Sequence, residues 1–371
     1  MLGIEGASAA LDAAAAWLGE RLGVDGPVLL RERAAILGIE AQGTTSAGGT
    51  CRLLRAGDGS WVALNLARRD DAELLAAWMG HEWDGPPWEA VEAHLATTGA
   101  RAAVERAQLL GIPAAEAVPS RAVPSGAGRA RPVTIVRARA GSDDRTARVP
   151  FVLDLAALWA GPLCTRLLGA RGARVVKVEL AGRPDSARAG DPGFWRLLNA
   201  GKEEVMLDPN QADGRAELTT LLDAADVVVT ASRPRAIDRL GLDLERRVQE
   251  QGLVWASITG YGYAGEWRDR VAFGDDAAVA GGLAVAAGGR DAPVFVGDAP
   301  ADPLAGMHAA LAVSRCLDEQ RGAFVDVSMR DAVRDAVGDA AAGGAATLQW
   351  PDPGATDPGA TNPGATERRD A

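Results

Sequence analysis

Two carboxylates, Asp298 and Asp302, stand in the segment of the chain whose residue types best suit covalent chemistry. They lie in the run VGDAPADPLAGMH (296–308), where Pro303 fits the first turn of a helix and makes Asp302 its expected N-cap. A carboxylate held at a helix N-terminus stays ionised and can attack an acyl group as a nucleophile. An aspartate at this position is also common as a cap alone. The residues leave open whether the segment is structural or catalytic, and which carboxylate would react.

The turn DLAALWAGP (154–162) is a second candidate, because it follows a strand pattern and precedes a helical one. In an open parallel sheet, ligands bind at the carboxyl ends of strands, near helix N-termini whose free N–H groups favour anions. The turn is not G-x-G-x-x-G, and no acidic residue follows at the ribose-binding spacing, which disfavours a nicotinamide enzyme. An ordinary strand-to-helix turn is the alternative.

The other reactive residue types form no recognisable site in the sequence. His81, His94 and His308 lack metal-ligand spacing, and the three cysteines are far apart with no Cys-x-x-Cys pair. The chain also lacks a Walker A sequence. We therefore expect no metal site, no disulfide framework and a reducing, cytoplasmic location.

The charge balance bears on the partners of the chain. Of its 371 residues, 39 are basic and 50 acidic, so the formal net charge is −11. Such a surface repels phosphate backbones and anionic lipids, and we expect neither nucleic acid nor a membrane as the main partner. Residues 1–23 carry Glu5 and Asp12 and no basic n-region, which indicates an amphipathic helix and not a signal peptide. No apolar run approaches the roughly 18 residues of a membrane span.

Residues 1–118 are expected to form a small α+β domain. Trp61–Leu66 predicts a strand after the turn at residues 57–59, and helical patterns cover residues 9–22, 71–79, 88–97 and 102–110. Residues 119–150 are rich in Pro, Gly, Ser and Arg and predict a linker, in which the apolar run 133–136 is a candidate edge strand.

Residues 151–342 are expected to form a large α/β domain with an open, mostly parallel sheet, because short β-branched runs alternate with helical patterns. Strands are predicted at residues 151–155, 174–178, 205–207, 227–230 and 253–258. The last stretch, residues 343–371, contains PDPGAT, DPGAT and NPGAT in succession. Such a Pro/Gly repeat buries little apolar area, so we expect a disordered tail.

The large block resembles the family III CoA-transferases, the group named for carnitine and formyl-CoA transferases. Six segments carry the likeness in the family's order: VLDLAALWAGPLCTRLLGARGARVVKVE (152–179), NAGKEEVMLD (199–208), DAADVVVTASRPRAIDRLGL (223–242), SITGYGYAGEWRDRVAF (257–273), DPLAGMHAAL (302–311) and VDVSMRDAV (325–333). The resemblance implies a Rossmann-like large domain that binds CoA. It also implies an aspartate nucleophile four residues before a glycine, which here is Asp302 before Gly306 and not Asp298.

The implied reaction moves CoA from an acyl-CoA donor to a small carboxylic acid. Asp302 would attack the thioester, and the released thiolate would return to form an aspartyl-CoA thioester, which the acceptor carboxylate then resolves. This covalent relay conserves the energy of the thioester. CoA enters it as a substrate, with no permanently bound cofactor and no metal.

Positions that would contact CoA carry over from the family's motifs. They are Trp159, Ala160, Leu207, Ala231, Ser232, Arg233, Arg239 and Phe273. Two departures concern the adenine and phosphate contacts: the usual Asn-Phe is Ala231-Ser232, and the usual Lys-Arg pair is Lys202-Glu203. Arg233 and Arg235 offer guanidinium groups that suit phosphate.

The order of the blocks also departs from the family. Relatives place the small domain after the large one, whereas residues 48–71 and 88–118 resemble that later region and come first, so the chain resembles a circular permutation of the family's order. The family's glycine loop, which closes over the aspartate, would then be Ser46-Ala47-Gly48-Gly49, although a glycine pair before a strand is often an ordinary turn. The resemblance further implies a homodimer.

Two other functions remain. The related α-methylacyl-CoA racemase uses a histidine shortly before the Gly-Leu that is Gly282-Leu283 here, but the matching position holds Phe273, so one acid-base partner is missing. A non-catalytic CoA-binding protein is the second alternative, given the altered adenine segment and the block order.

Overall fold

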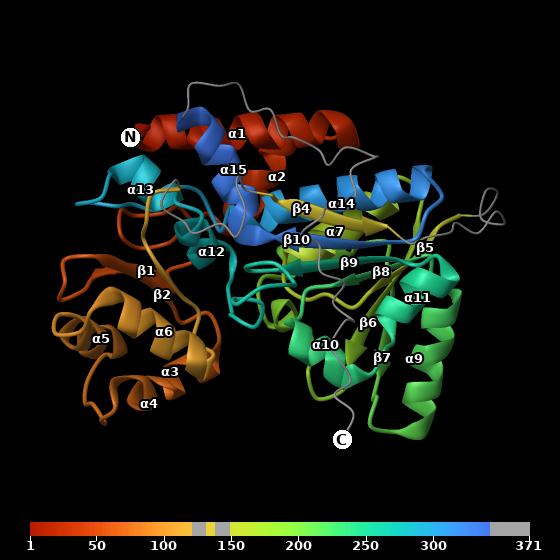
Figure 1. The fold of residues 1–371 in the computed structure, drawn as a ribbon, viewed down its shortest axis with the longest axis horizontal. Coiled ribbons are helices and arrows are strands. Elements are labelled where there is room, and N and C mark those ends of the chain that lie inside the picture. Colours follow the sequence, from red (N-terminus) through yellow and green to blue (C-terminus); the bar gives the residue numbers. More distant parts are fainter. Residues whose placement is uncertain (121–130, 138–148, 342–371) are drawn as a thin grey trace, which may run out of the picture.

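A seven-stranded sheet forms the centre of the computed structural model, which describes residues 1–120, 131–137 and 149–341 (Figure 1). Its strand order is β4-β10-β9-β8-β5-β6-β7, and every neighbouring pair is parallel except β4 with β10. The strands are β4 (Val133–Arg137), β5 (Phe151–Asp154), β6 (Arg174–Leu180), β7 (Glu203–Leu207), β8 (Val227–Thr230), β9 (Val254–Thr259) and β10 (Ala323–Ser328). The expected α/β class with a mostly parallel sheet is confirmed, and the run 133–136 is an edge strand.

The chain order of the six parallel strands makes the sheet doubly wound. From β5 the chain moves outward to β6 and β7, then returns to β8 beside β5 and continues outward to β9 and β10. This is the strand order of dinucleotide-binding folds, and it leaves a switch point between β5 and β8. At such a point consecutive loops diverge to opposite faces of the sheet, which opens the carboxyl ends of β5 and β8 to a ligand.

Helices cover both faces of the sheet. Strands such as β5, β8 and β9 are therefore buried along their whole length. On one face, the strands contact α7 (Ala160–Ala170), α14 (Ala301–Asp318) and α15 (Met329–Ala341). The helices α1 (Gly3–Leu22), α2 (Gly26–Leu37) and α8 (Pro192–Asn199) pack on these helices in the same core cluster. The other face packs against α9 (Ala212–Ala224), α10 (Pro234–Leu240) and α11 (Leu244–Gln251). The two layers lie above and below the sheet in Figure 1.

The first two helices share the core of the large sheet, although the residue pattern groups them with the small domain at 1–118. Leu11 and Leu18 of α1 and Leu29 of α2 are buried in one cluster with residues of α14 and α15. Gly26 allows the two helices to meet closely, since a Cβ atom there would lie 1.8 Å from the Ala15 carbonyl oxygen. The helix α2 is thereby placed against α14, which packs on the central sheet.

A smaller unit follows these helices, at the left of Figure 1. Its antiparallel sheet of β1 (Cys51–Arg55), β2 (Trp61–Asn65) and β3 (Ala114–Glu116) packs with its helices around the fully buried Trp78. The strand expected at 61–66 is β2, and the helix expected at 71–79 is divided at Leu74. The helices are α3 (Arg69–Glu73), α4 (Leu75–Met79), α5 (Pro87–Leu95) and α6 (Ala100–Leu110).

The small unit contacts the large sheet's domain through α12 (Gly274–Ala280) and α13 (Leu283–Gly288). Cys51, Leu53 and Ala63 are buried together with Val279 and Phe295. The domain limits at 118, 150 and 342 stay predictions, and both the tail at 343–371 and parts of the 119–150 linker lie outside the described residues. Within the described ranges, no helix combines the length and apolar character that a membrane crossing requires.

Candidate active site

Loops after β5 and β8 meet at the switch point of the sheet. Trp159 and Ala160 follow β5 at the start of α7, while Ala231, Ser232 and Arg233 follow β8 and lead into α10. The loops touch at Gly161, where a Cβ atom would lie 3.6 Å from the Cβ of Ala231. The structure therefore brings these five predicted CoA-binding positions to the edge of the sheet where a ligand is expected.

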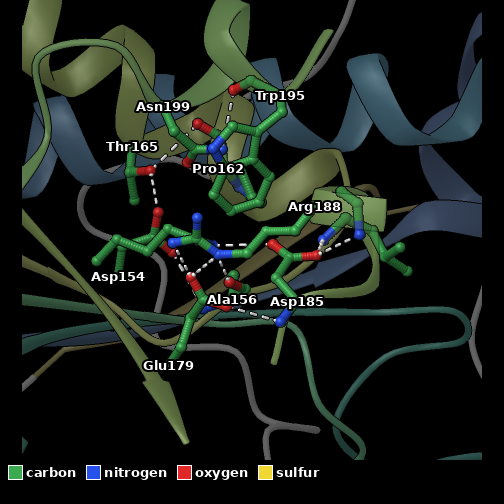
Figure 2. Close-up of polar contacts among 12 residues, drawn as sticks. Asp154, Ala156, Pro162, Thr165, Glu179, Asp185, Arg188, Trp195 and Asn199 are labelled. Atoms are coloured by element: carbon green, nitrogen blue, oxygen red, sulfur yellow. Dashed lines mark hydrogen bonds and ion pairs between the residues drawn. The ribbon is translucent and has the colours of Figure 1, made fainter. Parts of the chain in front are cut away.

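A buried ion-pair network holds the loop after β5 (Figure 2). The ammonium of Lys177 donates to the Ala156 carbonyl and to Asp185, each at 2.9 Å. Asp185 in turn accepts from the backbone N–H of Leu158 at 3.0 Å. Leu158 has a φ of 69°, a left-handed conformation that is unfavourable for a leucine, so the network fixes a backbone turn that the residue alone would not choose.

A second buried ammonium, that of Lys202, ties the same loop to α7 and α8. It donates to Asp154, to the Pro162 carbonyl and to Asn199, each at 3.0 Å. Asp154 also accepts from the Thr165 hydroxyl at 2.6 Å. Burial raises the pKa of Asp154, but Lys202 and Lys177 outweigh it and hold that pKa below its usual value.

Lys202-Glu203, which stands where the family usually has a Lys-Arg pair, has a structural role in this protein. Lys202 has three acceptors inside the protein, and burial lowers the pKa of its ammonium despite the opposing effect of Asp154. Its neighbour Glu203 pairs with Arg174 at 2.7 Å on the surface. Lys202 is thus an anchor of the loop, a role that the residue pattern gave no reason to expect.

Asp302 lies in the first turn of α14 but does not cap it. The helix begins at Ala301, and Pro300 holds the N-cap position, so the expectation that Asp302 is the N-cap is wrong. The reason is that Pro300 already has helical dihedral angles, so the helix starts one residue before Asp302 and its N-cap lies two residues before it. The side chain is free for other contacts: the Ala160 N–H hydrogen-bonds it, and its Oδ2 lies against Gly274.

Gly306 explains the spacing of the Asp-Pro-Leu-Ala-Gly motif. A Cβ atom at Gly306 would lie 2.7 Å from the Ala160 carbonyl oxygen, so a glycine one turn after Asp302 lets α14 approach the start of α7. This close approach is what places the Asp302 carboxyl beside the Ala160 N–H.

The charge state of Asp302 differs from the expectation of a permanently ionised group. Burial, together with the nearby Asp275 and Asp298, raises the pKa of Asp302 to about 7, although Arg33 and the Ala160 N–H lower it. The favourable field of the helix N-terminus does not outweigh desolvation. Burial likewise raises the pKa of Asp275 to about 6 and that of Asp276 to about 7. Asp302 is therefore poised to change protonation near neutral pH.

Asp298 is the less suitable nucleophile of the two carboxylates left open above. Asp298 is 2% exposed and forms an ion pair with Arg33 of α2, whereas Asp302, taken as a whole residue, is partly exposed. A carboxylate that is both paired and enclosed is hard for a substrate to reach.

The small unit contributes polar groups to the carboxyl cluster formed by Asp275, Asp276, Asp298 and Asp302. Asn65, at the end of β2, donates to Asp276 at 2.9 Å, and the Ser46 side chain hydrogen-bonds Asp275. Gly48 lies near the Arg33 guanidinium, because a Cβ atom at Gly48 would be 3.6 Å from its Nη2. The predicted glycine loop, in which Gly49 has a φ of 75°, is thus beside the cluster.

Cationic side chains gather around Arg233. Burial lowers the pKa of Arg233, and Arg235, Arg68 and Arg183 lower it further because their charges repel it. Its Nη1 is buried with no hydrogen-bond partner in the described part of the protein. Arg68 of the small unit also lies over the ring of Phe273, 5.6 Å from the ring centre. This group of like charges is suited to a polyanion.

The remaining predicted CoA positions lie farther from the switch point. Arg239 is exposed in the last turn of α10. Leu207 is buried at the end of the edge strand β7, separated from β5 by β6. Phe273 precedes α12, and its N–H donates to Asp276 at 3.0 Å. In the ranges that the structure describes, no three His, Cys, Asp or Glu side chains are grouped as a metal site would require.

The doubly wound sheet places this protein in the α/β class, and the carboxyl cluster and the cationic group lie near its switch point, where such folds bind ligands. The family model described as CoA-transferase family III matches residues 151–367, which is more than half of the chain. The chain therefore belongs to CoA-transferase family III.

Individual relatives match about half of the chain. A succinyl-CoA–D-citramalate CoA-transferase of Chloroflexus aurantiacus is 30% identical over 195 residues, 49% of this chain and 48% of that protein. A formyl-CoA:oxalate CoA-transferase of Afipia carboxidovorans is 33% identical over 196 residues, 49% of this chain and 46% of that protein. This chain thus spans about half the length of these relatives.

Two solved structures are similar to part of the chain. A CaiB/BaiF family protein from Brucella suis is 25% identical with a TM-score of 0.46, over 52% of this chain and 57% of the other. A hypothetical protein from Mycobacterium tuberculosis is 29% identical with a TM-score of 0.47, over 54% of this chain and 59% of the other.

Proposed function

We propose that this protein is a CoA-transferase that moves CoA from an acyl-CoA donor to a carboxylic acid, with Asp302 as the nucleophile. The observation that carries the proposal is the position of Asp302: its carboxyl lies beside the Ala160 N–H, at the carboxyl edge of the sheet where Trp159 and Arg233 also lie. Family membership supports the reaction class. The substrates named for the relatives, a CoA thioester and a dicarboxylic acid, support the kind of donor and acceptor.

The reaction begins when the ionised Asp302 attacks the thioester carbonyl of the donor. The C–S bond breaks, CoA thiolate leaves, and an aspartyl anhydride remains. The thiolate then attacks the aspartyl carbonyl, releases the donor as a carboxylate and forms an aspartyl-CoA thioester. The acceptor carboxylate attacks this thioester and expels the thiolate, which attacks the acceptor's acyl carbon and frees Asp302.

Each of the groups around Asp302 has a separate role in this reaction. The Ala160 N–H, at the N-terminus of α7, orients the carboxylate and favours its charged form. Arg233 and its cationic neighbours suit the phosphates of CoA. Gly48 adjoins Arg33, and we expect the loop of Gly48 and Gly49 to close over the carboxyl cluster during the reaction.

A transfer assay tests the proposal. Purified protein is incubated with succinyl-CoA or formyl-CoA and a panel of small mono- and dicarboxylic acids, and new acyl-CoA is measured by mass. We expect transfer with the unchanged chain and none with Asp302→Ala, which should still bind CoA. Transfer by a folded Asp302→Ala variant would exclude this nucleophile.

A racemase is the weaker alternative. Racemisation needs an acid and a base on opposite sides of the substrate carbon, and the Phe273 ring at the family position cannot exchange a proton. Exchange of the α-hydrogen of an acyl-CoA for deuterium, without transfer, would favour it. A non-catalytic CoA-binding protein would bind CoA yet show neither reaction.

We further propose that the chain is a circularly permuted family member and forms a homodimer in the cytoplasm. The small unit precedes the large sheet along the chain, as the permutation requires. The family resemblance implies dimers of two ring-shaped subunits that pass through each other. We expect the permutation to open this ring, so that tagged and untagged dimers exchange subunits under native conditions. Exchange no faster than unfolding would contradict an open subunit.

A further inference from the structure

Arg33 connects three segments that surround Asp302. Its guanidinium pairs with Asp298, in the loop that leads into α14. The guanidinium also lies over the ring of Trp159, 5.7 Å from the ring centre. Trp159 immediately precedes Ala160, whose N–H contacts Asp302. On its third side the guanidinium adjoins Gly48 of the predicted glycine loop.

Arg33 opposes the negative charges that surround Asp302. Asp275 of α12 and Asp298 of the preceding loop face Asp302 with like charge, and Arg33 of α2 faces it with opposite charge. Asp276 lies beside Asp275, and the N–H of Ala160 completes the surroundings. Without a cation, several carboxylates in a poorly hydrated site would hold protons, and a protonated Asp302 is a poor nucleophile.

We propose that Arg33 is a positioning residue for Asp302, which fixes the segment carrying that carboxyl through Asp298 and maintains its ionised form. The inference rests on the proposed function of Asp302 as nucleophile. Arg33 lies in α2, outside the six segments that resemble the family, so no motif assigns it a role. It acts through Asp298 and the local field and need not touch the substrate.

Transfer rates against pH test this role with two variants. Arg33→Gln removes the charge, and its loss should move the midpoint of the pH profile about one unit upward. With a midpoint near pH 7 this is an about fivefold loss of rate at pH 7 that nearly disappears at pH 9. Arg33→Lys should keep the original midpoint. Arg31→Gln, which breaks the Arg31–Asp12 pair on the exposed side of the same helix, is the matched control and should change neither.

A merely structural role predicts a different pattern. If Arg33→Gln lowers the rate equally at pH 7 and pH 9, or leaves the midpoint unchanged, the proposal is wrong. Asp298→Asn provides a second variant: it removes a like charge and leaves Arg33 in place, so the midpoint should move to lower pH. A shift to higher pH would contradict the account.

Infrared difference spectra separate this proposal from the proposed function. The carboxyl band lost in Asp302→Asn identifies Asp302, and its titration needs no turnover. In Arg33→Gln this band should titrate about one unit higher. If the protein transfers no CoA but the band shifts as expected, the proposed function fails and the charge-setting role of Arg33 stands. An unshifted band in an active enzyme overturns Arg33 alone.

Discussion

Gly274 leaves the space that Asp302 occupies: a Cβ atom at Gly274 would lie 2.2 Å from the Asp302 Oδ2 and 2.5 Å from the Ala299 carbonyl oxygen. Both distances are far below van der Waals contact. The first residue of α12 therefore fixes where the carboxyl of α14 can point, and it does so from a different part of the chain.

Gly274→Ala should remove most transfer activity, because the added methyl group must displace Asp302 or the backbone of Ala299. CoA affinity should change little. Gly338→Ala is the control, since a Cβ atom at this helical glycine meets nothing within 4 Å and should stabilise the protein by up to about 1 kcal/mol. Full turnover in Gly274→Ala would show that the carboxyl tolerates another position.

Asp302→Asn should stabilise the protein at pH 8. The folded-state pKa of Asp302, about 7, lies above its usual value of 3.8, so the stability that this carboxyl contributes is fully present below about pH 4 and is lost as the pH rises through 7. The amide resembles the neutral acid and avoids this loss. Because Asp302 as a whole residue is partly exposed, we expect a gain of only about 1–2 kcal/mol at pH 8 and almost none at pH 4, measured by urea unfolding.

Asp58→Asn is the control of opposite sign for that measurement. N–H groups of Ser60 and Ala100 lower the pKa of Asp58, so this variant should lose stability at pH 8 relative to pH 3. Equal stability of Asp302→Asn and the unchanged chain at both pH values would mean that the carboxyl is not desolvated.

Arg233→Ala should weaken CoA binding by roughly 1.5–3 kcal/mol, because a charge-assisted phosphate contact is lost. Arg239→Ala tests the second position taken from the family, at the exposed end of α10. Calorimetry measures both, with Arg246→Ala on the exposed side of α11 as a control that should leave affinity unchanged. Unchanged affinity in both test variants would place the nucleotide elsewhere.

Lys202→Met should destabilise the protein by about 3–5 kcal/mol, because it removes the Lys202 ammonium from the charged, buried carboxylate of Asp154. Adding Asp154→Asn should restore part of the loss. Arg174→Met, which breaks the exposed pair with Glu203, should have little effect in the same denaturation experiment. A loss as small as that of the surface pair would show that the network does not hold the loop.

The parallel sheet could be predicted from the sequence because its strands are short, apolar and separated by helical patterns. The runs at 151–155 and 227–230 match β5 and β8 closely, since buried parallel strands need apolar side chains on both faces. β10 and β1 were not predicted as strands: the former contains Asp326, and the latter contains arginines at positions 52 and 55.

Other features depend on contacts that a single sequence does not display. Asp302 was expected as an N-cap because Pro303 suits a first turn, but Pro300 suits one as well and starts the helix earlier. Arg33 pairs with Asp298 across 265 residues of sequence. Lys202 likewise reaches Asp154 only in the folded chain, so its burial could not be read from a polar, glycine-flanked turn.

The mass of the peptide that contains Asp302 tests most directly whether this carboxylate is the nucleophile. The protein is incubated with an acyl-CoA and no acceptor, quenched in acid, digested and analysed by mass spectrometry. We expect a CoA or acyl adduct on the peptide that contains Asp302. The adduct should be lost when the peptide is treated with hydroxylamine and absent in Asp302→Asn. An unmodified Asp302 in a protein that transfers CoA, or an adduct on Asp298 or Asp275 instead, would contradict this role of Asp302.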